Sequence, residues 1–184
     1  MDLTGKLLIA MPGMGDVRFD KSVVYLCAHS DKGAMGLIVN KPVHDLSFSH
    51  LLNQLGVKQG PGGAEIRVHF GGPVEHGRGF VLHSSDYPGG EATLHVDERF
   101  AMTATMDILQ AIAQGQGPER SIMALGYAGW GPGQIEAEIL RNGWLTAEAS
   151  PDLVFAKQDA TKWERALKTL GVDPVGLSSA AGRA

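Results

Sequence analysis

The sequence is poor in cysteine, since Cys27 is the only one. It can therefore form no internal disulfide and no structural zinc site built from several thiolate ligands. A lone thiol is typical of a protein from a reducing compartment, so we predict a cytoplasmic location. Cys27 lies in a run that is apolar on both faces. Although His29 is placed on the same side of an expected strand, we interpret Cys27 as an inert core thiol.

Long hydrophobic runs are also missing near the N-terminus. The apolar run there is far shorter than a membrane span, and Asp2 precedes Lys6 where a signal peptide has a positively charged lead-in. We expect no export signal, no anchor and no membrane partner.

Positive charge is in short supply, with 16 Lys and Arg against 20 Asp and Glu and a net charge of -4. Binding to a phosphate backbone requires clustered Lys and Arg, so this balance disfavours direct nucleic-acid binding. The 184 residues, 43% of them hydrophobic, are enough for one globular domain, 1–184, with a sizeable core. The small and polar segment after about residue 174 predicts a loose tail.

No common cofactor-binding or metal-binding motif is complete. The glycine-rich segment Pro12–Asp16 matches neither of the two usual phosphate-binding patterns. We interpret it as a tight turn in which Asp16 bonds backbone N–H groups, the alternative being that Asp16 orients a polar ligand. His69, His76 and His83 recur every seven residues, but glycines interrupt the region and the side chains need not converge. We expect neither a metal nor a cofactor.

A nucleophile with its base is equally hard to find. His83 precedes Ser84, Ser85 and Asp86, which places the residue types of a catalytic triad close in sequence. Triads form from groups that meet in space beside an oxyanion hole, so adjacency alone indicates no hydrolase.

Short apolar runs between turn residues predict strands, and longer periodic runs predict helices. We expect strands at 7–11, 22–29, 35–40, 66–70, 79–83, 92–96 and 121–125, and helices at 46–55, 105–114, 133–141 and 159–170. The strands at 22–29 and 35–40 form a hairpin, and the middle third is expected to be antiparallel. Ser47 is the expected N-cap of its helix, Gly56 its stop, and Thr161 with Glu164 a capping box. Hairpins mixed with non-alternating helices indicate an α+β fold.

The most informative stretch runs from Ala124 to Leu145, where a buried strand leads into a helix through the expected loop 126–133. Glycines there permit close backbone approach, while Tyr127 and Trp130 offer flat surfaces with a polar tip. The start of the helix at Gly133 presents N–H groups that could hold an anion. Nearby carboxylates at Glu136 and Glu138 oppose an anion and favour a purely structural helix start. Gln134 and Glu138 share a helix face and could line a cleft.

Several separate segments together resemble the bacterial YqgE/AlgH family from Leu8 to about Gly171. The segments that carry the resemblance are Met11-Pro12 with Asp16 and Phe19, Ser22 to Cys27, Gly33 to Gly36 with Asn40-Lys41-Pro42, Gly71 to Val74, Gly79 to His83, Ala124 to Ala128, and Trp130 with Gly133-Gln134, Glu136, Glu138-Ile139 and Trp144-Leu145. The resemblance implies an α+β fold in which a bent, mostly antiparallel sheet forms a partial barrel flanked by about four helices. It implies no established reaction, and members are often described as transcriptional regulators.

Two classes of function fit these observations. The first is a non-enzymatic cytoplasmic binding or regulatory module whose partner is a protein or a small molecule. It fits because the sequence shows no assembled set of nucleophile, base or metal ligands. The second is an enzyme acting on a small anionic or nucleotide-like substrate, which requires its polar side chains to converge. A DNA-binding regulator ranks lower, because neither a helix-turn-helix pair nor a basic face is evident. The candidate ligand-binding residues are Asp16, Asn40, His83, Tyr127, Trp130, Gln134 and Glu138.

Overall fold

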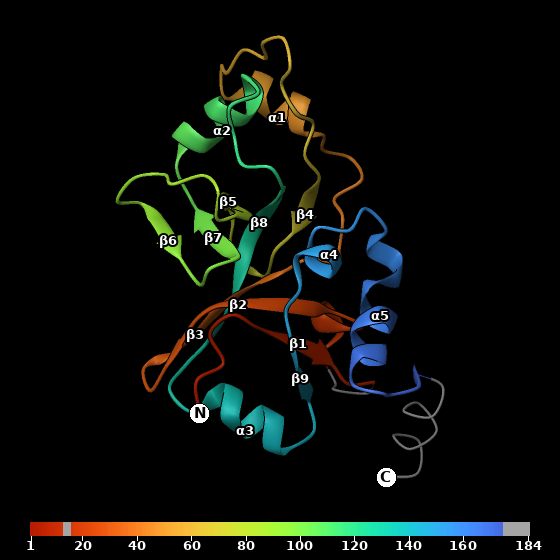
Figure 1. Cartoon of the computed structure of the whole chain (residues 1–184). Helices are drawn as coiled ribbons and strands as arrows, with labels where there is room; N and C mark the ends of the chain where they lie inside the picture. Colours follow the sequence, from red (N-terminus) through yellow and green to blue (C-terminus); the bar gives the residue numbers. More distant parts are fainter. Residues whose placement is uncertain (13–15, 175–184) are drawn as a thin grey trace.

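A computed structural model describes residues 1–12 and 16–174 of the chain. Within these residues nine strands form one sheet in the order β6-β7-β5-β8-β3-β2-β1-β9, with β4 alongside β8. The sheet curls into a half-barrel (Figure 1). The strands are β1 (Lys6–Ala10), β2 (Val23–Ser30), β3 (Gly33–Ile38), β4 (Val68–Phe70), β5 (Val74–Ser84), β6 (Thr93–His95), β7 (Phe100–Thr103), β8 (Ser121–Trp130) and β9 (Trp144–Glu148).

The predicted fold class is confirmed, because the strand pairs are antiparallel apart from β4 and β8. The hairpin of β2 and β3 is present. The expectation of an antiparallel middle third is wrong for β4, which runs parallel to β8 with Val68 opposite Met123. A parallel pair needs a long connection, and the sequence between these two strands supplies one.

Helices flank the sheet, and four of those in the described residues have seven or more residues, as expected. They are α1 (Phe48–Gln54), α2 (Met106–Ala113), α3 (Gln134–Leu140) and α5 (Lys162–Thr169). The structure also has a short helix, α4 (Pro151–Val154), and two 3-10 turns, η1 (Val17–Phe19) and η2 (Asp159–Thr161). None of the helices in this part of the chain is long and apolar enough to cross a membrane. The loose tail predicted after residue 174 lies outside the described residues.

The ends of α1 follow the predicted chemistry. The Ser47 hydroxyl oxygen accepts a hydrogen bond from His50 N at 3.1 Å, and Gly56 adopts a φ of +73° just after the helix. The predicted capping box at Thr161 is wrong, because the Thr161 hydroxyl donates to the Gln158 carbonyl oxygen instead of accepting from the helix. Thr161 is the last residue of η2, so its backbone is helical and not extended as a capping residue requires.

Alternation along the strands separates two hydrophobic layers. On β1, Leu7 and Ile9 face one cluster, which includes Trp163 of α5, while Leu8 faces another, which includes Ile135 of α3. The helices α5 and α3 therefore cover opposite faces of this part of the sheet, and α1 and α2 cover a third cluster at the far end of β8 (Figure 1). Cys27 is buried in the first cluster, and burial raises the pKa of its thiol to about 12, as expected of an inert core residue.

The strand β8 corrects the largest expectation drawn from the sequence. The segment from Gly126 to Trp130 is not a loop but the second half of β8, paired with β3. Gly126 allows the backbone of β8 to pass close to the backbone of Gly72, and it does not form a turn. A Cβ on Gly126 would lie 2.4 Å from the carbonyl oxygen of Gly72, and one on Gly72 would lie 2.1 Å from the carbonyl carbon of Tyr127. Larger residues at this crossing would push the chain away from β8.

Candidate functional site

The C-terminal half of β8 separates two pockets that share the wall formed by Val74, Gly129 and Trp130. We call the two together the β8 recess. The larger pocket, the aromatic groove, has a volume of about 740 Å³. Its walls come from β2, β3, β5 and β8, and its lining residues are Ala28, His29, Ser30, Lys32, Gly33, Ala34, Met35, Val74, Glu75, Arg78, Phe80, Tyr127, Gly129 and Trp130.

The smaller pocket, the acidic pocket, has a volume of about 270 Å³ and lies between η1, α3 and β8. Four of the seven residues predicted from the sequence line it: Asp16, Trp130, Gln134 and Glu138. The remaining lining residues are Arg18, Phe19, Pro73, Val74 and Gly129. The β8 recess therefore brings together residues that are more than a hundred positions apart in the chain.

Asp16 is positioned by the turn that it begins. Its carboxylate accepts hydrogen bonds from Arg18 N and Nε, both at 3.0 Å, and forms an ion pair with Arg18 Nη2 at 2.8 Å. The hydrogen bond from the Arg18 side chain lowers the pKa of Asp16, so this carboxylate is ionised at neutral pH. The predicted bonding of Asp16 to backbone N–H groups is confirmed at Arg18, and the same carboxylate also borders the acidic pocket.

Side chains of the first turn of α3 already make hydrogen bonds at the start of this helix. Gln134 Oε1 accepts from Gly131 N at 2.9 Å, which occupies an N–H group that the anion hypothesis needed. Glu136 accepts from His29 Nε2, while His29 Nδ1 accepts from Leu3 N at 2.9 Å. These contacts favour the structural interpretation of this helix start.

Glu138 provides the clearest polar group of the acidic pocket. Its Oε1 accepts from the indole Nε1 of Trp144 at 3.3 Å. Its Oε2 is buried and has no hydrogen-bond partner in the described residues. Together with Gln134, Glu138 lines one side of the pocket, which is the arrangement that their spacing on a helix predicts.

The two aromatic residues of β8 have different environments. Trp130 is only 7% exposed and packs edge to face against Trp144, with ring centroids 6.1 Å apart, so it is mainly a core residue that presents one border to the recess. Tyr127 is half-buried and makes an edge-to-face contact with Phe80 at 5.8 Å in the aromatic groove. Trp130 therefore offers less surface to a ligand than Tyr127 does, because alternation along β8 turns its side chain inward.

Asn40 and His83 lie outside the β8 recess. Asn40 ties two segments together, accepting from Val23 N at 2.9 Å and donating to the carbonyl oxygen of Lys21 at 2.8 Å. The ring nitrogens of buried His83 contact Thr103 Oγ1 and the carbonyl oxygen of Ser84, each at 2.8 Å. Burial lowers the pKa of His83, which keeps its imidazole neutral. The convergence that the enzyme hypothesis requires is thus limited to the residues around the start of α3.

No triad forms beside His83, because the Ser84 hydroxyl donates to the Asp86 carboxylate and not to the imidazole. In the described residues, no group of three or more His, Cys, Asp and Glu side chains is arranged to hold a metal ion.

Most residues of the aromatic groove were not predicted from the sequence. Lys32, Met35, Arg78 and Phe80 come from β2–β3 and β5, and their convergence depends on β8 pairing with both strands. A signal was present, because Gly33 to Gly36, Gly71 to Val74 and Gly79 to His83 were among the segments that carried the family resemblance. From the sequence alone these segments predict only strands and turns.

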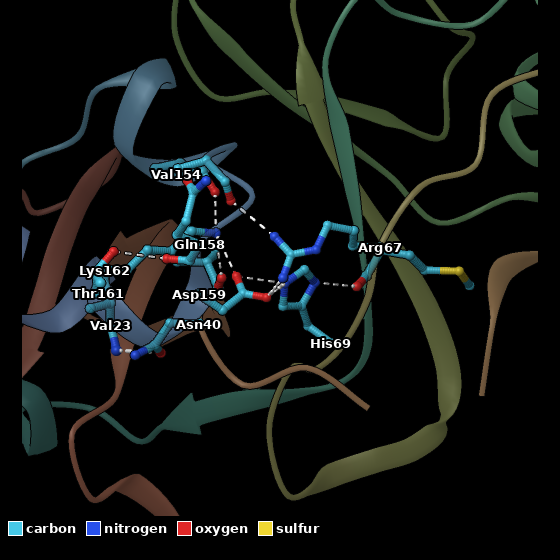
Figure 2. Close-up of polar contacts among 12 residues, drawn as sticks. Val23, Asn40, Arg67, His69, Val154, Gln158, Asp159, Thr161 and Lys162 are labelled. Carbon is cyan, nitrogen blue, oxygen red and sulfur yellow. Dashed lines mark hydrogen bonds and ion pairs between the residues drawn. The ribbon is translucent and has the colours of Figure 1, made fainter. Parts of the chain in front are cut away.

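A second concentration of polar groups lies away from the recess, where β4 meets η2 and α5 (Figure 2). Asp159 forms ion pairs with Arg67 and with Lys162 Nζ, the latter at 2.9 Å. His69 Nε2 lies 3.0 Å from the same carboxylate, and His69 Nδ1 lies 3.2 Å from the carbonyl oxygen of Met123. We call Arg67, His69, Asp159 and Lys162 the buried charge cluster.

The buried charge cluster is satisfied within the chain. Lys162 is 0% exposed, and its ammonium donates to the carbonyl oxygens of Val39 and Val154 at 2.9 and 2.7 Å as well as to Asp159. Burial lowers the pKa of Lys162 to about 7, and burial beside Lys162 lowers that of His69 to about 3. Perturbed groups of this kind can mark an active site, but here no ligand can reach Lys162 or His69, so the cluster holds the C-terminal helices on the sheet.

A third pocket, of about 500 Å³, adjoins the cluster through Arg67. Three of its charged lining residues are already engaged: Glu65 accepts from Ser49 N and Oγ, Arg120 pairs with Asp152 at 2.8 Å, and Arg67 pairs with Asp159. Glu119 and Lys157 also line this pocket, but none of the seven predicted site residues does. We take the β8 recess as the candidate functional site because it gathers five of those seven residues.

Comparisons with known proteins agree with the fold. Residues 7–175 match the family model described as AlgH-like (DUF179). A UPF0301 protein of Cereibacter sphaeroides is 61% identical over 184 residues, covering 100% of both chains. A UPF0301 protein of Rhodospirillum rubrum is 54% identical and covers 99% of this chain and 94% of its own length.

Two solved structures are similar along most of their length. The solution structure of the AlgH protein from Pseudomonas aeruginosa has a TM-score of 0.80 and 41% identity, covering 97% of this chain and 94% of that one. The crystal structure of a protein from Corynebacterium diphtheriae has a TM-score of 0.72 and 19% identity, covering 91% and 86%. The latter likeness concerns the fold alone.

Proposed function

The chain belongs to the AlgH-like family, and on that premise we propose that it is a non-enzymatic cytoplasmic binding or regulatory module. Its partner, a protein or a small molecule, is recognised in the β8 recess. One observation carries this proposal: two pockets of different chemical character meet at a single wall formed by Val74, Gly129 and Trp130. A concave site with an apolar floor and a few polar groups is the usual form of a ligand site.

The chemistry of the recess favours binding over acid–base catalysis. The imidazole that lines it, His29, has both ring nitrogens engaged, by Leu3 N and by Glu136. The hydroxyl oxygen of Ser30 accepts from Lys32 N at 3.1 Å. Within the described lining residues, a nucleophile next to a general base is therefore absent, whereas aromatic and charged groups suited to recognition are present.

A regulatory role would be indirect. The net charge of -4 and the mixed charges around the recess do not favour an extended basic face for a phosphate backbone. Regulation through a bound protein or metabolite requires no such face, and it is the form of regulation that we propose.

Thermal-shift screening of nucleotides, organic acids and short peptides tests the proposal. Compounds that raise the melting temperature are compared in Val74→Gln, which places a polar amide in the shared wall without changing charge, and in Leu94→Gln on β6. The two parent side chains are 37% and 41% exposed, so they form a matched pair. We expect binding to weaken about fivefold or more in Val74→Gln and to persist in Leu94→Gln.

Equal binding to both variants would place the ligand site elsewhere and contradict the proposal. Each bound compound is also recovered and examined by mass spectrometry. Unchanged compound supports a binding module, and conversion at a rate abolished by Val74→Gln would establish the rival, an enzyme acting in the same recess.

A further inference from the structure

The geometry points to a specific class of ligand for the aromatic groove: an amphipathic organic anion, with a flat apolar body and one anionic group at its end. This inference rests on the proposed function, since it names the chemistry that the β8 recess recognises. Three features carry it: the apolar floor of the groove, its cationic rim and the acidic pocket on the other side of the shared wall.

The floor of the groove is apolar and partly aromatic. Tyr127 and Phe80 meet edge to face, and Met35 lies partly buried against the same core. A flat ring or a short acyl chain buries apolar surface against such side chains, and the thioether of Met35 adapts to its outline. A volume of about 740 Å³ suits a small organic molecule with several rings or an equivalent chain.

The rim of the groove carries the cations. The ammonium of exposed Lys32 makes no hydrogen bond or ion pair with the described residues, so it is available to a ligand. The guanidinium of Arg78 lies 5.1 Å from the centre of the Phe80 ring and 3.7 Å from the Glu75 carboxylate. The side chains of Arg78 and Glu75 are each 54% exposed. An incoming anion can therefore meet Lys32 directly and Arg78 at the edge of the aromatic floor.

The carboxylate and the imidazole of the groove are already engaged. Glu75 lies 3.7 Å from Arg78 Nη1, and His29 is bonded to Leu3 N and to Glu136, so the imidazole offers no further donor to a ligand. The anionic group is consequently directed to the side of the groove bounded by Lys32 and Arg78.

The acidic pocket gives the ligand its orientation. Asp16 and Glu138 line that pocket on the other side of the shared wall, and the Oε2 atom of Glu138 has no hydrogen-bond partner among residues 1–12 and 16–174. A second anionic group in this direction would be repelled, although Arg18 offsets part of the charge of Asp16. The recess therefore selects a ligand with one anionic end over a dianion with a charge at each end.

Two fluorescent probes that differ mainly in one charged group test the inference. 1-Anilinonaphthalene-8-sulfonate is a flat aromatic anion, and N-phenyl-1-naphthylamine is its neutral counterpart without the sulfonate. Titration of the full chain should show severalfold tighter binding of the sulfonate, and only its affinity should fall as salt is raised.

Variants locate the charge that recognises the sulfonate. Lys32→Glu should weaken binding of the sulfonate about five- to tenfold and leave the neutral probe unchanged, because an attraction is replaced by repulsion. Lys58→Glu, which makes the same charge change at an exposed position outside the recess, is the control. Val74→Gln should weaken both probes, and Leu94→Gln neither. Circular dichroism and the melting temperature of each variant exclude probe binding to unfolded chain.

Equal affinity for the two probes, together with sensitivity of both to Val74→Gln, would overturn the charge preference while the β8 recess remained a binding site. Sulfonate binding that is insensitive to both Lys32→Glu and Val74→Gln, or no binding at all, would overturn the inference outright. The compound screen described above then decides the proposed function separately.

Discussion

Two regions of this molecule use charged side chains in opposite ways. In the buried charge cluster, Asp159 contacts Arg67, His69 and Lys162, and these side chains join β4 to the C-terminal helices. In the β8 recess, Lys32 and Arg78 reach solvent at the edge of an aromatic floor. In this molecule the strongly lowered pKa values belong to the structural cluster, whereas solvent-exposed cations beside the half-buried ring of Tyr127 mark the candidate site.

The largest effect is expected from Asp159→Ala. The change leaves the buried ammonium of Lys162 without its carboxylate and removes the partner of the partly exposed Arg67, and removal of one partner from a buried pair typically costs about 3–5 kcal/mol of unfolding free energy. Asp152→Ala on neighbouring α4 is the control, because the Asp152 side chain is 83% exposed and its pair with Arg120 is worth at most about 1 kcal/mol. Urea unfolding measures both, and similar losses in the two variants would remove the distinction between buried and exposed charge.

Trp130→Ala separates packing from recognition inside the recess. Trp130 is 7% exposed and contacts both Trp144 and Phe19, so its truncation should cost about 3–5 kcal/mol in chemical unfolding. Tyr127→Ala should cost less, because the ring of Tyr127 is only half-buried, yet it should weaken the binding of aromatic probes more. A reversed order of stabilities would show that Tyr127 is the packing residue and would move the recognition surface to Trp130.

A smaller effect is expected from acid titration of His69. Its pKa is about 3 in the folded chain and about 6.5 when unfolded, so the unfolded chain takes up a proton first as the pH falls. The stability contributed by neutral His69 is therefore complete above about pH 6.5 and is lost progressively between about pH 6.5 and 3, by up to a few kcal/mol.

The measurement is urea unfolding of the natural chain and of His69→Gln across this range. The difference in unfolding free energy between them should shrink as the pH falls, and exposed His76→Gln should follow the natural chain. Carboxylates such as Asp86, whose pKa is also lowered, contribute equally to all three proteins and cancel in the comparison. A constant difference would mean that His69 is already protonated in the folded chain.

Local chemistry was predictable from the sequence, and the arrangement in space was not. Ser47 and Gly56 mark the two ends of α1 as expected, because capping depends only on neighbouring backbone groups. The glycines near Tyr127 predicted a loop, yet they permit β8 to cross the Gly71-Gly72 segment, and that partner lies far away in the sequence. Tertiary pairing overrode local propensity there.

The candidate site was predictable to a similar extent. Gln134 and Glu138 share a helix face that spacing alone reveals, and they do line one pocket. Asn40 and His83 are polar residues next to turns, but their bonds to Val23 and Thr103 depend on the folded sheet. Lys32, Arg78 and Phe80 were missed because they meet only where β8 places β3 and β5 on its two sides.

The most direct test of the account maps the bound probe onto the chain. Backbone amide shifts are followed by NMR while 1-anilinonaphthalene-8-sulfonate is added to the 184-residue protein. We expect the largest shifts on Lys32, Met35, Phe80, Tyr127 and Gly129, and we expect them to shrink in Val74→Gln. Shifts concentrated at the pocket beside Arg67, with the β8 recess unchanged, would contradict it.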